Sequence, residues 1–233
     1  MLQFSVFPDP YLLVEHAAQL FVQQAVATRG RFSAALSGGS TPRALYERLA
    51  SAEFSSRIPW QDVHLFWGDE RCVPPDHADS NYRMTAESLL GRVALPAENI
   101  HRIHGELAPH EAAAHYEAGL RAFFGSTPVF DLVLMGMGDD GHTASLFPDS
   151  PALAESARWA VAVEHTAPPP PLVSRVTLTF GVFNAARRVV FLVTGASKAQ
   201  KLAEIRRGAD LPAGRIRPPN GDLLWLVDEA AAA

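Results

Sequence analysis

The residues best suited to acid–base chemistry lie in one glycine-rich segment near the middle of the chain. Asp140 and His142 stand two residues apart, after the run Gly136-Met137-Gly138. A neutral imidazole, with an ordinary pKa of about 6.5, is a good general base at neutral pH, and a neighbouring carboxylate can orient it. The letters GMGDDG also match the dinucleotide pattern GxGxxG, but two aspartates would then stand where a pyrophosphate should lie. We therefore interpret this segment as a glycine turn that presents a general base from the start of a helix.

A second candidate is an anion-binding loop, Ser37-Gly38-Gly39-Ser40-Thr41, which Pro42 follows. Two glycines permit close approach of the backbone to a ligand, and hydroxyl residues before a helix leave N–H groups and the positive end of the helix dipole free for an anion. The loop lacks the GxxxxGK[ST] pattern of a nucleotide-binding P-loop. We predict a cradle for a phosphate or an oxyanion, the alternative being an ordinary capped turn.

Positive charge follows three other apolar segments. In the sequence GDER, Arg71 could bind a phosphate or a carboxylate as a planar fork, with Asp69 and Glu70 fixing it or contacting sugar hydroxyls. Arg175 and Lys198 could complete a ring of cations around a phosphate. Taken singly, each of these charges is equally compatible with a solvated surface.

The segments that precede these motifs are short, apolar and rich in β-branched residues, so we predict strands there. They alternate with longer amphipathic segments, which is typical of an α/β fold with helices on both faces of a mostly parallel sheet. Ligands of such sheets bind outside the carboxyl ends of the strands, where these motifs would converge. The predicted strands are 32–37, 63–67, 130–135, 159–163, 175–179, 189–193 and 223–227, and the predicted helices are 11–28, 42–51, 80–91, 109–124 and 197–206.

Composition excludes several classes of protein. The 233 residues, 48% hydrophobic and 19% charged, can form one domain over residues 1–233, with room for a small extra lobe. A net charge of −5 argues against nucleic acid or a membrane as partner, and no apolar run approaches the ~20 residues of a membrane span. The single Cys72 excludes a disulfide framework, and His110 and His115 are one residue too far apart for HExxH, so we predict no metal site. We expect a cytoplasmic protein, a monomer or a weak homo-oligomer.

Five segments together resemble the 6-phosphogluconolactonase family, in the same order along nearly the whole chain. They are LSGGSTP, GDERCVPPDHADSNY, FDLVLMGMGDDGHTASLFP, RVTLT and VTGASKAQ. The resemblance implies a modified Rossmann-like sheet and hydrolysis of 6-phospho-D-glucono-1,5-lactone in the oxidative pentose phosphate pathway, with no cofactor. It also implies that His142 is the general base, with Arg71, Arg175, Lys198 and the loop at 37–41 binding the substrate.

Two other functions remain open at this point. Glucosamine-6-phosphate deaminases share the fold and the Asp-Gly-His turn, but they typically carry a glutamate five residues after the histidine, where this chain has Phe147. They also tend to have Asp-Glu-Tyr where this chain has Asp69-Glu70-Arg71. A non-catalytic sugar-phosphate-binding protein would keep the glycine loop but would leave Asp140 and His142 without a role.

Overall fold

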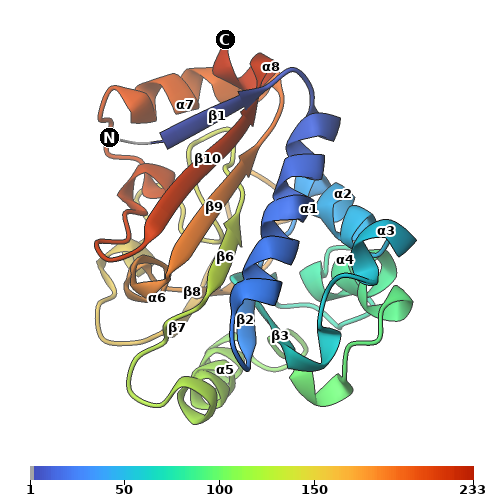
Figure 1. The fold of residues 1–233 in the computed structure, drawn as a ribbon. Coiled ribbons are helices and arrows are strands. Elements are labelled where there is room, and N and C mark those ends of the chain that lie inside the picture. The colour runs from blue at the N-terminus through green and yellow to red at the C-terminus, as the bar shows by residue number, and fades with distance from the viewer. Residues whose placement is uncertain (1–2) are drawn as a thin grey trace.

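The computed structural model describes residues 3–233, and its centre is a parallel sheet of seven strands (Figure 1). Every neighbouring pair in this main sheet runs parallel, which confirms the predicted α/β class. The central strands are buried along nearly their whole length, as expected when helices cover both faces of a sheet. In spatial order the strands are β1 (Gln3–Phe7), β10 (Asp222–Asp228), β9 (Arg188–Val193), β6 (Leu132–Met135), β2 (Phe32–Leu36), β3 (Val63–Trp67) and β5 (Ile100–His101).

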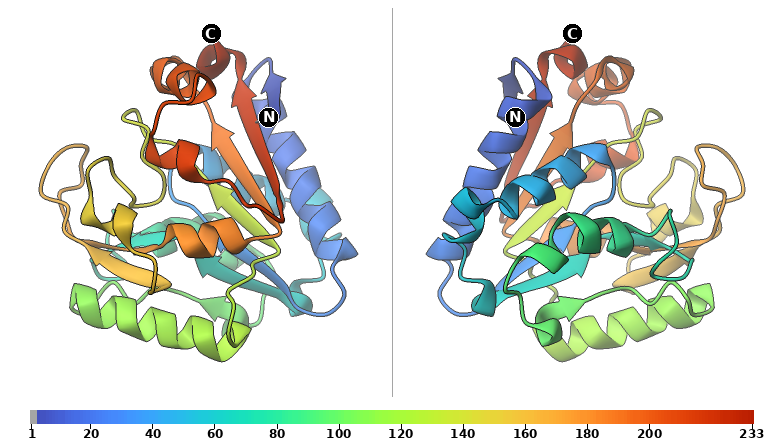
Figure 2. Two further views of the ribbon diagram at one scale, coloured as in Figure 1. Left: turned by 90° about the vertical axis from the view of Figure 1, so that its left-hand side faces the viewer. Right: turned by 90° about the vertical axis from the view of Figure 1, so that its right-hand side faces the viewer.

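Helices cover both faces of this sheet. The long helix α1 lies across one face and α6 lies on the other (Figure 2). Asp9 begins α1 by accepting a hydrogen bond from the Leu12 N–H at 2.8 Å, and Pro10 follows at the first helical position. The helices are α1 (Pro10–Ala27), α2 (Ser40–Leu49), α3 (Ala52–Ser55), α4 (Asn81–Ser88), α5 (Pro109–Phe124), α6 (Phe180–Ala185), α7 (Ala199–Arg206) and α8 (Glu229–Ala232).

A second, antiparallel sheet of three strands adjoins the main sheet at its carboxyl edge. It consists of β4 (Asp69–Arg71), β8 (Arg175–Leu178) and β7 (Ala160–Val163), in that order. Gly68 joins the two sheets, because its N–H donates to the Leu36 carbonyl and its own carbonyl accepts from the Leu178 N–H, both at 2.8 Å. No strand was predicted at residues 69–71, but these residues continue directly as a strand paired with β8.

Two further features differ from the prediction. Strand β1 was not predicted, although it pairs with β10 at one end of the main sheet. His142 does not start a helix: Gly141 and Ala144 have φ angles of +85° and +49°, and Thr143 instead bridges to Leu146. Positive φ angles are incompatible with an α-helix, so the segment is an irregular loop.

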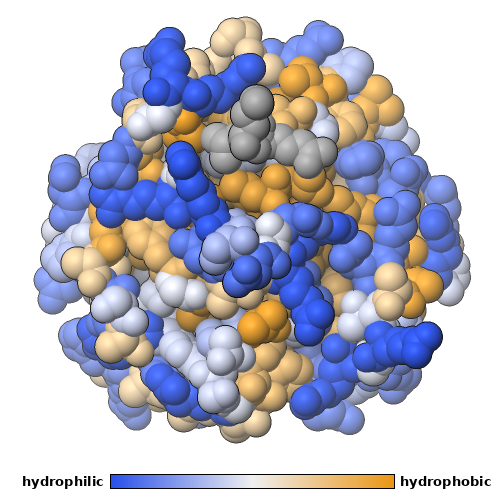
Figure 3. All heavy atoms as spheres, turned by 60° about the vertical axis from the view of Figure 1, so that its left-hand side comes forward, coloured by the Kyte–Doolittle hydropathy of each residue, from blue (hydrophilic) through white to orange (hydrophobic). Residues whose placement is uncertain are grey.

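The surface in Figure 3 mixes hydrophilic side chains with smaller hydrophobic areas between them. Within residues 3–233, no helix combines the length and the apolar character that crossing a membrane requires.

Candidate active site

Nine of the eleven predicted site residues converge on one cavity at the carboxyl edge of the main sheet. Strands β2 and β6 are neighbours at the centre of the main sheet. Beyond β2 the sheet continues with β3 and β5, and beyond β6 it continues in the opposite direction with β9 and β10. Ligands of open α/β sheets bind in the crevice at such a reversal of strand order. The cavity there has a volume of about 510 Å³, and nine of the predicted site residues line it: Ser37, Gly38, Gly39, Asp69, Arg71, Asp140, His142, Arg175 and Lys198.

Asp140 and His142 form a hydrogen-bonded pair in this cavity. The distance from Asp140 Oδ1 to His142 Nδ1 is 2.5 Å, and the same oxygen accepts the His142 backbone N–H at 3.0 Å. Burial raises the pKa of Asp140, but the hydrogen bonds from His142, together with the positive charge of this side chain when it is protonated, outweigh the effect of burial and leave the pKa below its ordinary value. A carboxylate that accepts from Nδ1–H leaves the Nε2 lone pair of the neutral imidazole available as a base.

The position of this imidazole leaves no room for a side chain at residue 138, so this residue must be glycine. A Cβ at residue 138 would lie 2.1 Å from both Cε1 and Nδ1 of His142. The Gly138 N–H also donates to the His142 carbonyl at 2.9 Å, which closes the turn. The glycine pattern that resembles a nucleotide loop therefore makes room for a histidine ring.

Asp69 is a buried acid that lines the same cavity, with only 5% of its surface exposed. Its carboxylate accepts the Ser145 hydroxyl at 2.6 Å, and its carbonyl accepts the Asn81 side-chain amide at 3.0 Å. Gly38 lies against the same amide, because a Cβ there would stand 2.1 Å from Asn81 Oδ1. These contacts lock the glycine loop, Asp69 and α4 together.

Glu70, which the sequence left as either catalytic or structural, faces away from the cavity and holds the beginning of α4. Its buried carboxylate accepts the N–H groups of Arg71, Asn81 and Tyr82, each at 2.7 Å, and the Ser80 hydroxyl at 3.0 Å. Burial raises its pKa, while these hydrogen bonds oppose the rise. Three of these four donors belong to residues at the start of α4, so Glu70 has a structural role there.

Three cations face the cavity. Arg175 is 4% exposed and Arg71 is half-buried, and within residues 3–233 the Nε–H of each has no hydrogen-bond partner. Burial lowers the pKa of Arg175, and the nearby Arg71 also contributes to this. Lys198 Nζ lies 2.5 Å from Asp139 Oδ1. Buried donors that lack a partner are costly, so the two arginines are suited to an anion that enters the cavity.

Two of the predicted loop residues lie elsewhere. Ser40 and Thr41 form the first turn of α2 and line a separate cavity beside α1. The Thr41 hydroxyl is 2.7 Å from that of Thr194. The expected five-residue cradle is thus limited to residues 37–39, because the helix begins one residue after Gly39 and turns the next two side chains away.

Other residues near the histidine were not predicted as site residues. Phe147 packs on His142 with ring centres 4.5 Å apart, and His165 stacks on the other side of Phe147 at 4.1 Å. The Pro168–Pro170 segment lines the cavity. Asn81 also lines it and could have been found, because it lies in one of the motifs that carry the family resemblance.

Within residues 3–233, no three histidine, cysteine, aspartate or glutamate side chains are grouped as a metal ion would require. The arrangement offers an oriented imidazole for proton transfer and three cations for binding an anion.

The chain is similar to known proteins over nearly its whole length. Residues 8–225 match the family model described as glucosamine-6-phosphate isomerases/6-phosphogluconolactonase. The 6-phosphogluconolactonase of a Nostoc species is 44% identical over 98% of this chain and 96% of its own, and the human one is 43% identical over 98% and 92%.

Solved structures are also similar to this chain over nearly its whole length. A crystal structure described as the devB protein matches with a TM-score of 0.91 at 37% identity, covering 100% of this chain and 98% of the other. A monomeric glucosamine-6-phosphate deaminase has a TM-score of 0.84 over 99% of both chains but is only 17% identical, so this likeness concerns the fold alone. The chain therefore belongs to the glucosamine-6-phosphate isomerase/6-phosphogluconolactonase family, as the order of its motifs predicted.

Proposed function

We propose that this chain hydrolyses 6-phospho-D-glucono-1,5-lactone to 6-phosphogluconate, with His142 as the general base. The observation that carries the mechanism is the Asp140–His142 pair, which faces a cavity that three cations also line. Relatives at 44% and 43% identity are named 6-phosphogluconolactonase, so the assignment as a hydrolase does not depend on the role of any one residue.

The proton transfers follow from the geometry of the pair. Nε2 of neutral His142 takes a proton from water as the water oxygen bonds to the lactone carbonyl carbon, which leaves a tetrahedral oxyanion. Asp140, at 2.5 Å from Nδ1, stabilises the imidazolium that forms. The intermediate then collapses, the bond from that carbon to the ring oxygen breaks, and Nε2 returns the proton to this oxygen. General base catalysis of this kind contributes about 10² to 10⁴ in rate.

The cations would position the substrate through its phosphate. Arg175 and Lys198 offer N–H donors to the phosphate oxygens, with Arg71 near the phosphate or the sugar hydroxyls, and the backbone of Gly38 and Gly39 lies on the same cavity wall. Binding at this remote end fixes the carbonyl carbon against His142, which lowers the entropic part of the barrier.

Phe147 supports hydrolysis over deamination. The deaminase reaction is expected to use a glutamate at this position, but here a buried phenyl ring packs on the imidazole. A phenyl ring can neither accept nor donate the proton that such a glutamate would carry. The proposal therefore assigns no deaminase activity to this chain.

A parallel assay on two substrates tests the proposal. Freshly generated 6-phosphogluconolactone and glucosamine 6-phosphate are each incubated with the protein, and the spontaneous hydrolysis of the lactone is subtracted. We expect faster acid release from the lactone and no ammonia from the amino sugar. Ammonia release would overturn the assignment in favour of the deaminase, and inactivity on both substrates would favour a binding protein.

A further inference from the structure

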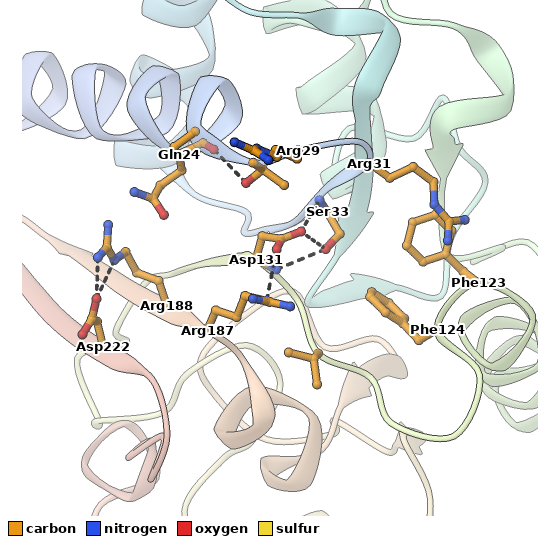
Figure 4. Close-up of a pocket in the computed structure, with 13 residues that line it drawn as sticks. Gln24, Arg29, Arg31, Ser33, Phe123, Phe124, Asp131, Arg187, Arg188 and Asp222 are labelled. Carbon is orange, nitrogen blue, oxygen red and sulfur yellow. Dashed lines mark hydrogen bonds and ion pairs between the residues drawn. The ribbon is translucent and has the colours of Figure 1, made fainter.

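The amino edge of the main sheet carries a second cavity, at the opposite ends of the strands that lead into the candidate active site. Its volume is about 620 Å³, and its walls come from the segments where β2, β6, β9 and β10 begin (Figure 4). Four arginines line it: Arg29, Arg31, Arg187 and Arg188. We name it the arginine cavity and propose that it binds a small molecule bearing a di- or triphosphate group.

The two aspartates of this cavity already have partners. Asp131 accepts the N–H and the hydroxyl of Ser33 at 2.9 and 2.8 Å, and it lies 3.3 Å from Arg187 Nε. Asp222 forms an ion pair with Arg188. The lining therefore carries four cations and two anions, a local excess of two positive charges in a chain of net charge −5. Such a concentration of charge attracts anions.

The remaining two arginines have donors to spare. Within residues 3–233, neither Arg29 nor Arg31 forms an ion pair with an acidic side chain. The Arg31 guanidinium lies 4.4 Å from the ring centre of Phe123, a stacking contact that holds its plane and leaves its N–H edges available. Arg187 is 72% exposed and can turn toward a ligand. Each guanidinium presents five N–H donors in a fork that matches phosphate oxygens.

The volume and the charges of the cavity favour a small polyphosphate over other anions. Four guanidinium groups spread around one hollow exceed what a single phosphate can contact, whereas a di- or triphosphate distributes its charge over several of them. The volume lies within the roughly 300 to 1,000 Å³ of small-molecule sites. Asp131 and Asp222 lie among the arginines (Figure 4) and would repel a long polyanion such as nucleic acid or an acidic peptide.

An aromatic wall suggests how the rest of the ligand could be held. Phe124 lines the cavity beside Phe123 and Arg31 (Figure 4). A ring at this place offers a surface on which a nucleobase can stack. Inorganic triphosphate and ATP share the same phosphate chemistry, so a comparison of the two measures what the base contributes.

Titration calorimetry and amide chemical-shift mapping of the full chain test the proposal. We expect inorganic triphosphate to bind in low salt and to shift amides at residues 28–33, 123–131 and 187–188. Arg29→Ala and Arg187→Ala should each weaken binding by about tenfold or more, because each removes charge-assisted hydrogen bonds. Arg92→Ala is the matched control, since this exposed arginine lines neither cavity. Both replaced arginines are exposed, and unchanged circular dichroism would verify that the variants fold.

The mapping separates this site from the candidate active site. Shifts confined to residues 37–39, 136–142 and 196–198, with binding abolished by Lys198→Ala and unaffected by Arg29→Ala, would overturn the proposal. So would equal losses in Arg29→Ala and Arg92→Ala, which would indicate nonspecific attraction. Tighter binding of a long acidic peptide than of triphosphate would replace the small molecule with a protein partner. Tighter binding of ATP than of triphosphate, reversed by Phe124→Ala, would extend the proposal to nucleotides.

Discussion

The two ends of the same parallel strands carry cations in different physical states. At the carboxyl edge, Arg175 is 4% exposed, and the neighbouring acid–base pair is joined at 2.5 Å. At the amino edge, the Arg187 side chain is 72% exposed. Buried groups held by several contacts keep one geometry, which catalysis requires. Exposed guanidinium groups are not held in one geometry, so they are suited to ligand binding and not to catalysis.

The direction of the strands explains this difference. Each central strand is followed at its carboxyl end by a segment that contains glycine, and the glycine loops after β2 and β6 line the active-site cavity. The amino ends are instead reached from helix ends, α1 before β2 and α5 before β6. The negative end of a helix dipole favours nearby cations, which accounts for arginine at this edge but not for an open cavity that collects four of them.

Among variants that compare the two edges of the sheet, we expect His142→Ala to have the largest effect on activity. Loss of the general base should lower kcat for the lactone by about 10² to 10⁴, with the fold intact. Arg187→Ala, at the other end of the strands, should leave kcat within about twofold, because an exposed arginine far from the site contacts no reacting group. Steady-state kinetics of both variants measure this. Near wild-type kcat in His142→Ala would remove the proposed mechanism.

Gly138→Ala tests whether geometry alone sets the rate at the carboxyl edge. The new Cβ would lie 2.1 Å from the imidazole and push it aside, and a displacement of about 1 Å can cost about 10² in kcat. Gly136→Ala is a matched control, because its Cβ would meet only Ser37 Oγ, at 3.8 Å. Equal kinetics of the two variants would mean that the ring position is not critical.

Lys198→Ala should have a smaller effect, through binding. Removing a cation from a phosphate site should raise KM for the phosphorylated lactone by about tenfold and leave the unphosphorylated lactone nearly unchanged. Asp139→Ala breaks the same ion pair but keeps the cation, so it should not raise KM. If both variants lose affinity equally, the ion pair itself and not the cation is what matters.

Much of this arrangement was predictable from local sequence. The strands that end at Leu36, Trp67, Met135 and Val193 are short apolar runs, and parallel geometry then brings the glycine and acid–base motifs to one edge. The family resemblance added the role of His142. The contact between Asp140 and His142 agrees with their spacing of two residues, because a tight turn lets such neighbours meet.

Features imposed by distant partners were not predictable. The charged residues 69–71 have no strand pattern of their own, and they become β4 only because β8 pairs with them. Thr41 turns away from the cavity because α2 begins at Ser40, a boundary that the loop sequence does not specify. The arginine cavity has no motif at all. Arg31 precedes β2 and Arg187 precedes β9, and only the strand order brings these two distant segments to one edge of the sheet.

The smallest expected effect concerns stability and pH. The folded chain lowers the pKa of Asp140, so this carboxylate stabilises the fold above the unfolded pKa of about 3.9, and the contribution is lost as the pH falls through the lower folded value. Because the side chain is 36% exposed, solvent screening limits the contribution to below about 1 kcal/mol.

Urea unfolding of wild type and Asp140→Asn at pH 7 and at pH 3 measures this contribution directly. The difference in the free energy of unfolding should be present at pH 7 and should shrink at pH 3, where the wild-type carboxylate begins to take up a proton. Asp222→Asn is the matched variant at the amino edge. Its carboxylate is 60% exposed, so its removal should change stability less than the removal of Asp140 does. A difference for Asp140→Asn that stays constant with pH would mean that the amide disturbs packing around His142, and that the charge of Asp140 contributes nothing to the stability of the carboxyl edge.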